Sequence, residues 1–132
     1  MSNNELQGWV VLIVDDEPDN LTVAQRVLSY GGAQVCVARD GREGLDVLTS
    51  GLRPTFVLLD LSMPEMDGWE MLRRVRETPG LAQITVIALT AHAMAGDRER
   101  ALQAGFNGYI AKPFRIDSFL DEIRRCLADA AH

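Results

Sequence analysis

The sequence has 132 residues, of which 47% are hydrophobic and 24% charged, a composition typical of one folded domain and not of a disordered, collagen-like or coiled-coil chain. Its net charge of −6 opposes nonspecific binding to nucleic acid or to an anionic membrane surface. The uninterrupted apolar run Trp9–Val14 is far shorter than the roughly 18 residues that a membrane span requires. We therefore predict a cytoplasmic protein that binds neither nucleic acid nor membranes directly, with one domain over residues 1–132 and its core over about 9–127.

Five apolar stretches rich in β-branched residues predict the strands of a sheet. Because these stretches are continuously apolar rather than alternating, each strand is expected to be buried on both faces, as in a parallel sheet covered by helices. The predicted strands are Val10–Val14, Val35–Ala38, Phe56–Leu59, Ile84–Leu89 and Tyr109–Ala111.

Helix start and stop signals lie between these stretches. Pro18 suits the first turn of a helix that runs to the Gly31-Gly32 pair. Asp40 with Glu43 resembles a capping box and predicts the start of the second helix.

The third helix has the same kind of start, Asp67 with Glu70, and it stops at Pro79. A fourth helix is expected over about 96–104, because Gly105 suits a left-handed C-cap. The fifth helix carries an apolar stripe that should pack on the sheet, formed by Ile116, Phe119, Leu120, Ile123 and Leu127.

Strands that alternate with helices over short connections predict an α/β doubly wound fold, with a five-stranded parallel sheet flanked by five helices. We expect the polar first eight residues and the Ala-rich end after Leu127 to be held loosely. The two cysteines, Cys36 and Cys126, have no CxxC motif or His-rich spacing, so we interpret both as buried thiols without chemistry.

Polar residues interrupt the apolar pattern at the carboxyl ends of four predicted strands. Asp15 and Asp16 follow the first strand, Asp60 ends the third, Thr90 follows the fourth and Lys112 follows the fifth. In an open parallel sheet this edge is where ligands bind, so we expect these five side chains to meet.

Three carboxylates in a partly dry crevice repel one another unless a cation offsets their charge. Oxygen ligands without His or Cys favour a hard ion, and a site with few protein ligands suits Mg²⁺. Carboxylates beside Mg²⁺, a Lys ammonium and a Thr hydroxyl suit phosphoryl transfer, with Asp60 as the nucleophile.

Four segments of the sequence together resemble the response-regulator receiver domain, a CheY-like family, with a match over about Trp9–Leu127. They are Val11–Pro18 (VLIVDDEP), Val57–Gly68 (VLLDLSMPEMDG), Ala88–Ala93 (ALTAHA) and Gly108–Phe114 (GYIAKPF). The resemblance implies a flavodoxin-like strand order of 2-1-3-4-5. It also implies a signalling switch that catalyses only its own phosphorylation and dephosphorylation.

The resemblance assigns a role to each site residue. Asp60 would be the phosphorylated residue, and it would hold Mg²⁺ together with Asp15, Asp16 and the backbone carbonyl of Ser62. Lys112 would contact the phosphoryl group.

Three more positions carry expectations from the family. Thr90 would be the switch hydroxyl, Tyr109 the aromatic ring that changes rotamer on activation, and Lys112-Pro113 a cis peptide bond.

The phosphoryl donor would be a sensor histidine kinase or a histidine phosphotransfer protein. A downstream protein would bind the face made by the fourth helix, fifth strand and fifth helix, and a phosphorylation-dependent dimer is a further expectation. Met1 favours a free-standing regulator over a segment of a hybrid kinase.

Three alternatives share parts of this pattern. A Mg²⁺-dependent phosphatase with an aspartyl-phosphate intermediate has a second carboxylate where this chain has Ser62. A flavodoxin-like cofactor-binding protein has a Ser-, Thr- and Gly-rich loop after the first strand, where the acidic residues Asp15, Asp16 and Glu17 would repel a flavin phosphate. The third is a receiver fold that serves as a scaffold without being phosphorylated.

Other polar residues are interpreted as solvent-facing. His92 lacks a second imidazole nearby in the sequence and is assigned to a loop surface rather than to a metal site. Arg73, Arg74 and Arg76 are assigned to a solvated helix face rather than to a nucleic-acid-binding stripe.

Overall fold

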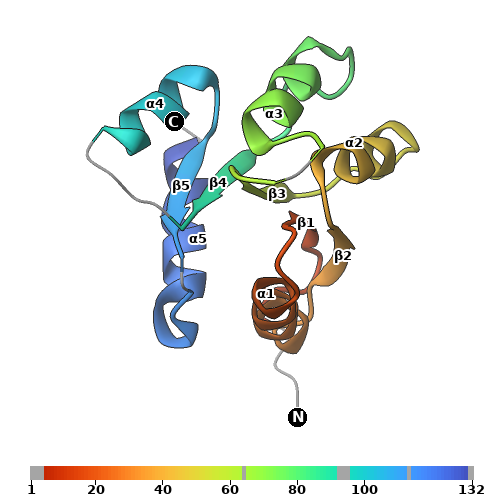
Figure 1. The fold of residues 1–132 in the computed structure, drawn as a ribbon. Helices are drawn as coiled ribbons and strands as arrows, with labels where there is room; N and C mark the ends of the chain where they lie inside the picture. Colours follow the sequence, from red (N-terminus) through yellow and green to blue (C-terminus); the bar gives the residue numbers. More distant parts are fainter. Residues whose placement is uncertain (1–4, 64, 92–95, 113, 131–132) are drawn as a thin grey trace.

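The computed structural model describes residues 5–63, 65–91, 96–112 and 114–130. Its sheet has five parallel strands in the order β2-β1-β3-β4-β5, which confirms the predicted fold (Figure 1). The strands are β1 (Val10–Val14), β2 (Gln34–Ala38), β3 (Phe56–Asp60), β4 (Val86–Thr90) and β5 (Gly108–Ala111).

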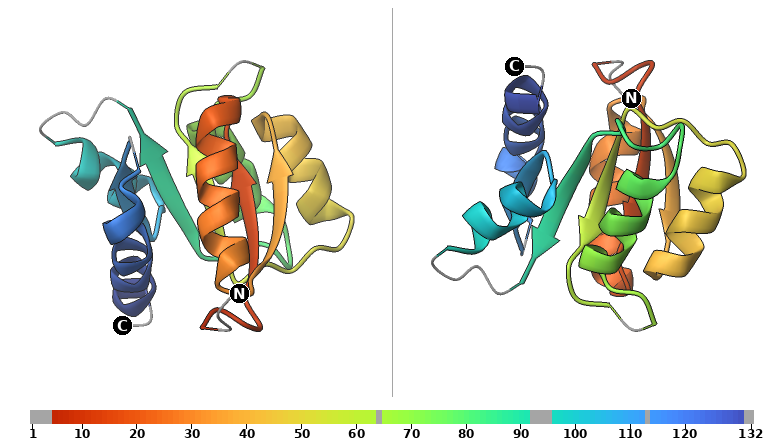
Figure 2. Two further views of the ribbon diagram at one scale, coloured as in Figure 1. Left: turned by 90° about the horizontal axis from the view of Figure 1, so that it is seen from below. Right: turned by 90° about the horizontal axis from the view of Figure 1, so that it is seen from above.

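Helices cover both faces of the sheet, as parallel crossovers require. Figure 2 shows α1 and α5 on one face and α2, α3 and α4 on the other. Within the described residues, no helix is long and apolar enough to cross a membrane. The helices are α1 (Pro18–Tyr30), α2 (Gly41–Thr49), α3 (Gly68–Glu77), α4 (Asp97–Ala104) and α5 (Ile116–Ala130).

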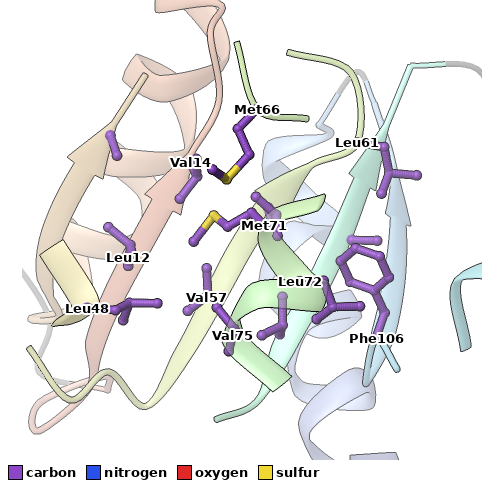
Figure 3. Close-up of a cluster of buried hydrophobic side chains, with 14 of the residues drawn as sticks. Leu12, Val14, Leu48, Val57, Leu61, Met66, Met71, Leu72, Val75 and Phe106 are labelled. Carbon is purple, nitrogen blue, oxygen red and sulfur yellow. The ribbon is translucent and has the colours of Figure 1, made fainter. Parts of the chain in front are cut away.

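Side chains of the strands divide between two cores. In β1, Val11 and Ile13 belong to the core beneath α1 and α5, whereas Leu12 and Val14 belong to the core beneath α2, α3 and α4. Figure 3 shows part of the second core, where Met71 of α3 lies among the side chains of β1 and β3. Burial on both faces explains the continuous apolar sequences of β1, β3 and β4. The prediction of such burial is wrong for the edge strand β2, where only Ala38 is buried.

The predicted helix ends are largely confirmed. The Asp40 carboxylate accepts a 2.8 Å hydrogen bond from the Glu43 N–H, and the Asp67 carboxylate accepts a 2.9 Å bond from the Glu70 N–H. Gly105 ends α4 with φ 113°, the left-handed conformation expected of it. The strand predicted to begin at Ile84 begins two residues later, since the Ile84 N–H is already bonded to the Leu81 carbonyl within a turn.

The prediction for the start of the chain is wrong over residues 5–8. Leu6 is fully buried, and its N–H donates a 2.7 Å bond to the Gly31 carbonyl. Glu5 forms a 3.0 Å ion pair with Arg124 of α5. Leu6 is therefore part of the core beneath α1 and α5, because a hydrogen-bonded turn from Leu6 to Trp9 directs the leucine inward.

The apolar stripe of α5 is only partly buried. Phe119, Ile123 and Cys126 face the sheet, but Ile116 is 71% exposed. Ile116 lies on the flank of the helix, where it lines a groove with Leu120 and with residues of α1. Its prediction as a core residue is wrong because helical spacing does not distinguish the centre of an apolar face from its flank.

The three arginines of α3 also differ from one another. Arg73 and Arg74 are exposed and pair with Glu70, as expected of a solvated face. Arg76 is half-buried and donates hydrogen bonds to backbone carbonyls before β4 and β5. The solvent-facing interpretation is therefore wrong for Arg76.

Candidate functional site

The predicted polar residues converge at the carboxyl edge of the sheet. Asp15 directly follows β1, Asp60 and Thr90 are the last residues of β3 and β4, and Lys112 directly follows β5. The register pairs Asp60 with Leu89 and Thr90 with Ala111, so these strand ends are level with one another. The parallel topology thus brings together residues that are far apart in the sequence.

The three predicted carboxylates form one cluster. Oxygen atoms of Asp15, Asp16 and Asp60 all lie within 4.8 Å of one another. Asp15 and Asp60 are buried, at 0% and 4% exposure, whereas Asp16 is exposed. An all-oxygen donor set with one side open to solvent fits Mg²⁺, which retains several water ligands.

Lys112 lies against this cluster. Its Nζ is 2.9 Å from Asp15 Oδ2 and 3.4 Å from Asp60 Oδ1, and its side chain is 6% exposed. Burial alone would lower the pKa of Lys112, but its hydrogen bond to Asp15 and the charges of Asp15 and Asp60 outweigh burial and raise the pKa. The ammonium is therefore a fixed positive charge beside the two buried carboxylates.

One lysine does not offset three carboxylates. Burial, and next the negative charge of Asp15, raises the pKa of Asp60 from 3.8 to about 7. The charge of Lys112 lowers the pKa of Asp60, and so does the Ser62 N–H, which donates a 3.3 Å hydrogen bond to Asp60 Oδ1. These two effects are smaller than those of burial and Asp15. The site therefore favours a bound cation, which would keep Asp60 ionised at neutral pH.

The loop after β3 forms the second side of the site. A groove of about 470 Å³ lies here, lined by Asp16, Leu61, Ser62, Met63, Asp67 and Trp69. Ser62 lies at its exposed rim, two residues after Asp60. The assignment of its carbonyl as a metal ligand stays a prediction.

Sequence analysis identified Gly68 only as part of a motif and of a helix start. In the structure, a Cβ atom at Gly68 would clash with the Asp60 carbonyl oxygen. Only glycine allows α3 to begin this close to Asp60. The Asp67-Gly68 pair at the start of α3 is the sequence signal for this close approach.

Thr90 and Tyr109 lie next to the site on the side of α4. Thr90 is 6% exposed, and the hydroxyl oxygen of Tyr109 is buried. Burial, and next the negative charge of Asp97, raises the pKa of Tyr109. The rotamer change of Tyr109 on activation stays a prediction. His92 and Pro113, and with them the predicted cis peptide bond, lie outside the described residues.

The arrangement can accept a phosphoryl group. Asp60 offers a carboxylate oxygen as a nucleophile, Lys112 offers a positive charge 3.4 Å away, and the acidic pair offers a place for a divalent ion. Phosphoryl transfer depends mainly on such positioning and charge stabilisation.

Comparisons with known proteins agree with this chemistry. The family described as "Response regulator receiver domain" matches residues 11–124. A 14.6 kDa protein of Leptolyngbya boryana is 45% identical over 103 residues, which cover 78% of each chain. The polar-differentiation response regulator DivK of Brucella anthropi is 37% identical over 120 residues, covering 91% of this chain and 97% of DivK.

Solved structures extend the comparison to the fold. The receiver domain of the sensor histidine kinase PA1611 from Pseudomonas aeruginosa PAO1 has a TM-score of 0.80 and 35% identity, covering 92% of this chain and 98% of that domain. That structure has a magnesium ion coordinated in its active-site cleft. With the strand order and the acidic edge of the sheet, these matches show that the chain belongs to the response-regulator receiver domain family of two-component signalling.

Proposed function

We propose that this receiver domain accepts a phosphoryl group on Asp60 from a phosphohistidine of a sensor kinase or of a histidine phosphotransfer protein. The observation that carries the proposal is the position of the buried Asp60 carboxylate, within 3.4 Å of Lys112 and in one cluster with Asp15 and Asp16. Asp15, Asp16, Asp60 and the carbonyl of Ser62 would hold Mg²⁺. The ion would offset the charges of the carboxylates and of the phosphoryl oxygens.

The transfer is a displacement at phosphorus. An Asp60 oxygen forms the new O–P bond while the N–P bond to the donor imidazole breaks, and the imidazole nitrogen keeps the electron pair and takes a proton from water. Lys112 then pairs with a phosphoryl oxygen as well as with Asp15, which orients the group. The domain would catalyse only its own phosphorylation and dephosphorylation.

The phosphoryl group would change the surface on the side of α4. Its oxygens would attract the Thr90 hydroxyl at the end of β4, and Tyr109 would adjust beside it. Tyr109 also lines a groove of about 520 Å³ between α4 and α5, with Arg98, Leu102, Glu122 and Arg125 among its other residues. We propose this α4–β5–α5 face as the surface for a downstream protein in the cytoplasm, and a phosphorylation-dependent dimer stays a prediction.

The direct test is the intact mass of the wild type and of Asp60→Asn after incubation with acetyl phosphate, with and without Mg²⁺. We expect one labile phosphoryl adduct on the wild type, dependent on Mg²⁺, and none on Asp60→Asn. The control Asp46→Asn removes an exposed carboxylate of α2 and should label like the wild type. An adduct on Asp60→Asn would overturn the assignment. The absence of any adduct, with a phosphorylated histidine kinase as a second donor, would favour the scaffold alternative.

Thr90→Ala should separate phosphorylation from the response to it. The variant keeps Asp60, Lys112 and the acidic pair, so we expect normal uptake of the phosphoryl group. It lacks the hydroxyl that the phosphoryl oxygens would attract, so most of the change in amide hydrogen exchange over α4 and β5 should disappear. Thr90→Ser retains a hydroxyl and should restore the change. An undiminished response in Thr90→Ala would show that the signal takes another route.

A further inference from the structure

We infer that Trp69 and Arg100 form a latch that holds α4 against α3 and couples α4 to the loop that follows Asp60. The guanidinium of Arg100 lies over the indole of Trp69, 5.3 Å from the ring centroid. This distance is within the range of a cation–π interaction. Trp69 is on α3 and Arg100 is on α4, so the contact joins two helices that cover the same face of the sheet (Figure 2).

Both partners are held in place by neighbours. The indole packs edge-on against Phe106, with ring centroids 5.5 Å apart and planes at 82°. Arg100 Nη1 donates a 3.2 Å hydrogen bond to Asp97, one turn earlier in α4. Burial, and next the negative charge of Asp97, raises the pKa of Tyr109, the proposed switch residue on β5.

Helix α4 buries few of its side chains. Among its residues, Asp97–Ala104, only Ala101 is buried, and Leu102 is 43% exposed. The helix follows Gly96, which offers no capping side chain. A weakly anchored helix opens at low cost in free energy, so a single contact to α3 has a measurable effect on it.

Trp69 also reaches the site. It lines the groove beside Asp60 together with Leu61, Ser62 and Met63. It directly follows Gly68, where a Cβ atom would clash with the Asp60 carbonyl oxygen, so the start of α3 packs closely against the end of β3. A shift of the loop after Asp60 on phosphorylation would therefore move the indole under Arg100. This last step rests on the proposed function, whereas the latch in the resting protein does not.

The test compares Arg100→Gln with Arg98→Gln by amide hydrogen exchange of α4 in the resting protein. Both variants remove an exposed arginine from the same helix, but Arg98 lies on the α4–α5 groove and not over Trp69. An exposed cation–π contact is worth roughly two- to fivefold in an equilibrium, so exchange over α4 should accelerate by about that factor in Arg100→Gln and not in Arg98→Gln. Trp69→Leu also removes the packing on Phe106, so it should accelerate exchange at least as much as Arg100→Gln, and adding Arg100→Gln to it should have no further effect. Equal acceleration by Arg98→Gln, or an additive double variant, would overturn the latch.

Fluorescence gives a second readout, because Trp9→Phe leaves Trp69 as the sole tryptophan of the chain. In that background, Arg100→Gln should change the resting emission and Arg98→Gln should not. Acetyl phosphate with Mg²⁺ should change the Trp69 emission of the Trp9→Phe protein, which is the parent of this series. Phosphorylation of this parent without such a change would overturn the coupling. A parent that takes up no phosphate would count against the proposed function, and the resting-state exchange would still decide the latch.

Discussion

Without metal, Asp60→Asn is expected to be more stable than the wild type by about 2–4 kcal/mol above pH 8, measured by urea unfolding in the presence of EDTA. Asp60 is 4% exposed, and burial and the charge of Asp15 raise its pKa to about 7. Each pKa unit corresponds to about 1.4 kcal/mol of preference for the protonated form in the folded protein. Ionising this group therefore costs stability, and asparagine removes the charge at similar size.

The stability gain of Asp60→Asn should increase as the pH rises. The pKa of Asp60 is about 7 in the folded protein and near 3.8 in the unfolded chain, so the folded protein binds the extra proton between these values. The destabilisation is absent below about pH 4, grows as the pH rises through this window and is complete above about pH 7. The stability gain of Asp60→Asn should follow the same curve, whereas exposed Asp46→Asn should show none. A gain that is constant from pH 4 to pH 8 would contradict this account.

Magnesium should reduce the stability difference between the two proteins. A cation held by Asp15, Asp16 and Asp60 offsets the repulsion that destabilises the wild type, and ligand binding stabilises by mass action. Millimolar Mg²⁺ should therefore raise the unfolding free energy of the wild type at pH 8 and have a much smaller effect on Asp60→Asn. An equal effect of Mg²⁺ on both proteins would place the ion elsewhere.

The predictable parts of this molecule follow from local pattern and topology. Continuous apolar runs and short capping signals specify the strands and helices, and a parallel sheet necessarily brings its carboxyl ends to one edge. That is why the sequence alone predicts that Asp15, Asp60 and Lys112, which are far apart in the chain, lie together. The proposed chemistry of the site then follows from the residue types.

The parts that sequence analysis missed depend on the neighbours of a side chain in space. Leu6 is buried because a turn directs it against Gly31, and Ile116 is exposed because it lies on the flank of its helix. The contact between Trp69 and Arg100 needs two helices in a particular relative position. Periodicity within one element carries none of this information.

Arg76 is another side chain whose surroundings depend on the fold and not on local pattern. It is half-buried, and burial lowers its pKa. Its Nη1 donates to the carbonyls of Ala82 and Ile84 at 3.1 and 2.6 Å, and its Nη2 donates to the Gly105 carbonyl and Asn107 Oδ1, both at 2.8 Å. One side chain of α3 thus satisfies acceptors in the connections that lead into β4 and β5.

Arg76→Met should destabilise the protein by about 2–4 kcal/mol, because several part-buried acceptors lose a charged donor at once. The measurement is urea unfolding, with Arg74→Met as the matched control. Arg74 is exposed and its ion pair with Glu70 spans 3.8 Å, so its loss should cost less than about 0.5 kcal/mol. Equal losses for the two variants would show that the hydrogen bonds of Arg76 contribute no more than a surface contact.

The same variant should leave the chemistry of Asp60 intact. The acceptors of Arg76 precede β4 and β5, at the amino edge of the sheet, whereas Asp60, Thr90 and Lys112 lie at the carboxyl edge. Under conditions where Arg76→Met is folded, its yield of phosphoryl adduct from acetyl phosphate should therefore match that of the wild type. A large loss of yield in the folded variant would mean that the two edges are coupled through β4 and β5. Equal yields would show that the contacts that hold the fold together are separable from those that perform its chemistry.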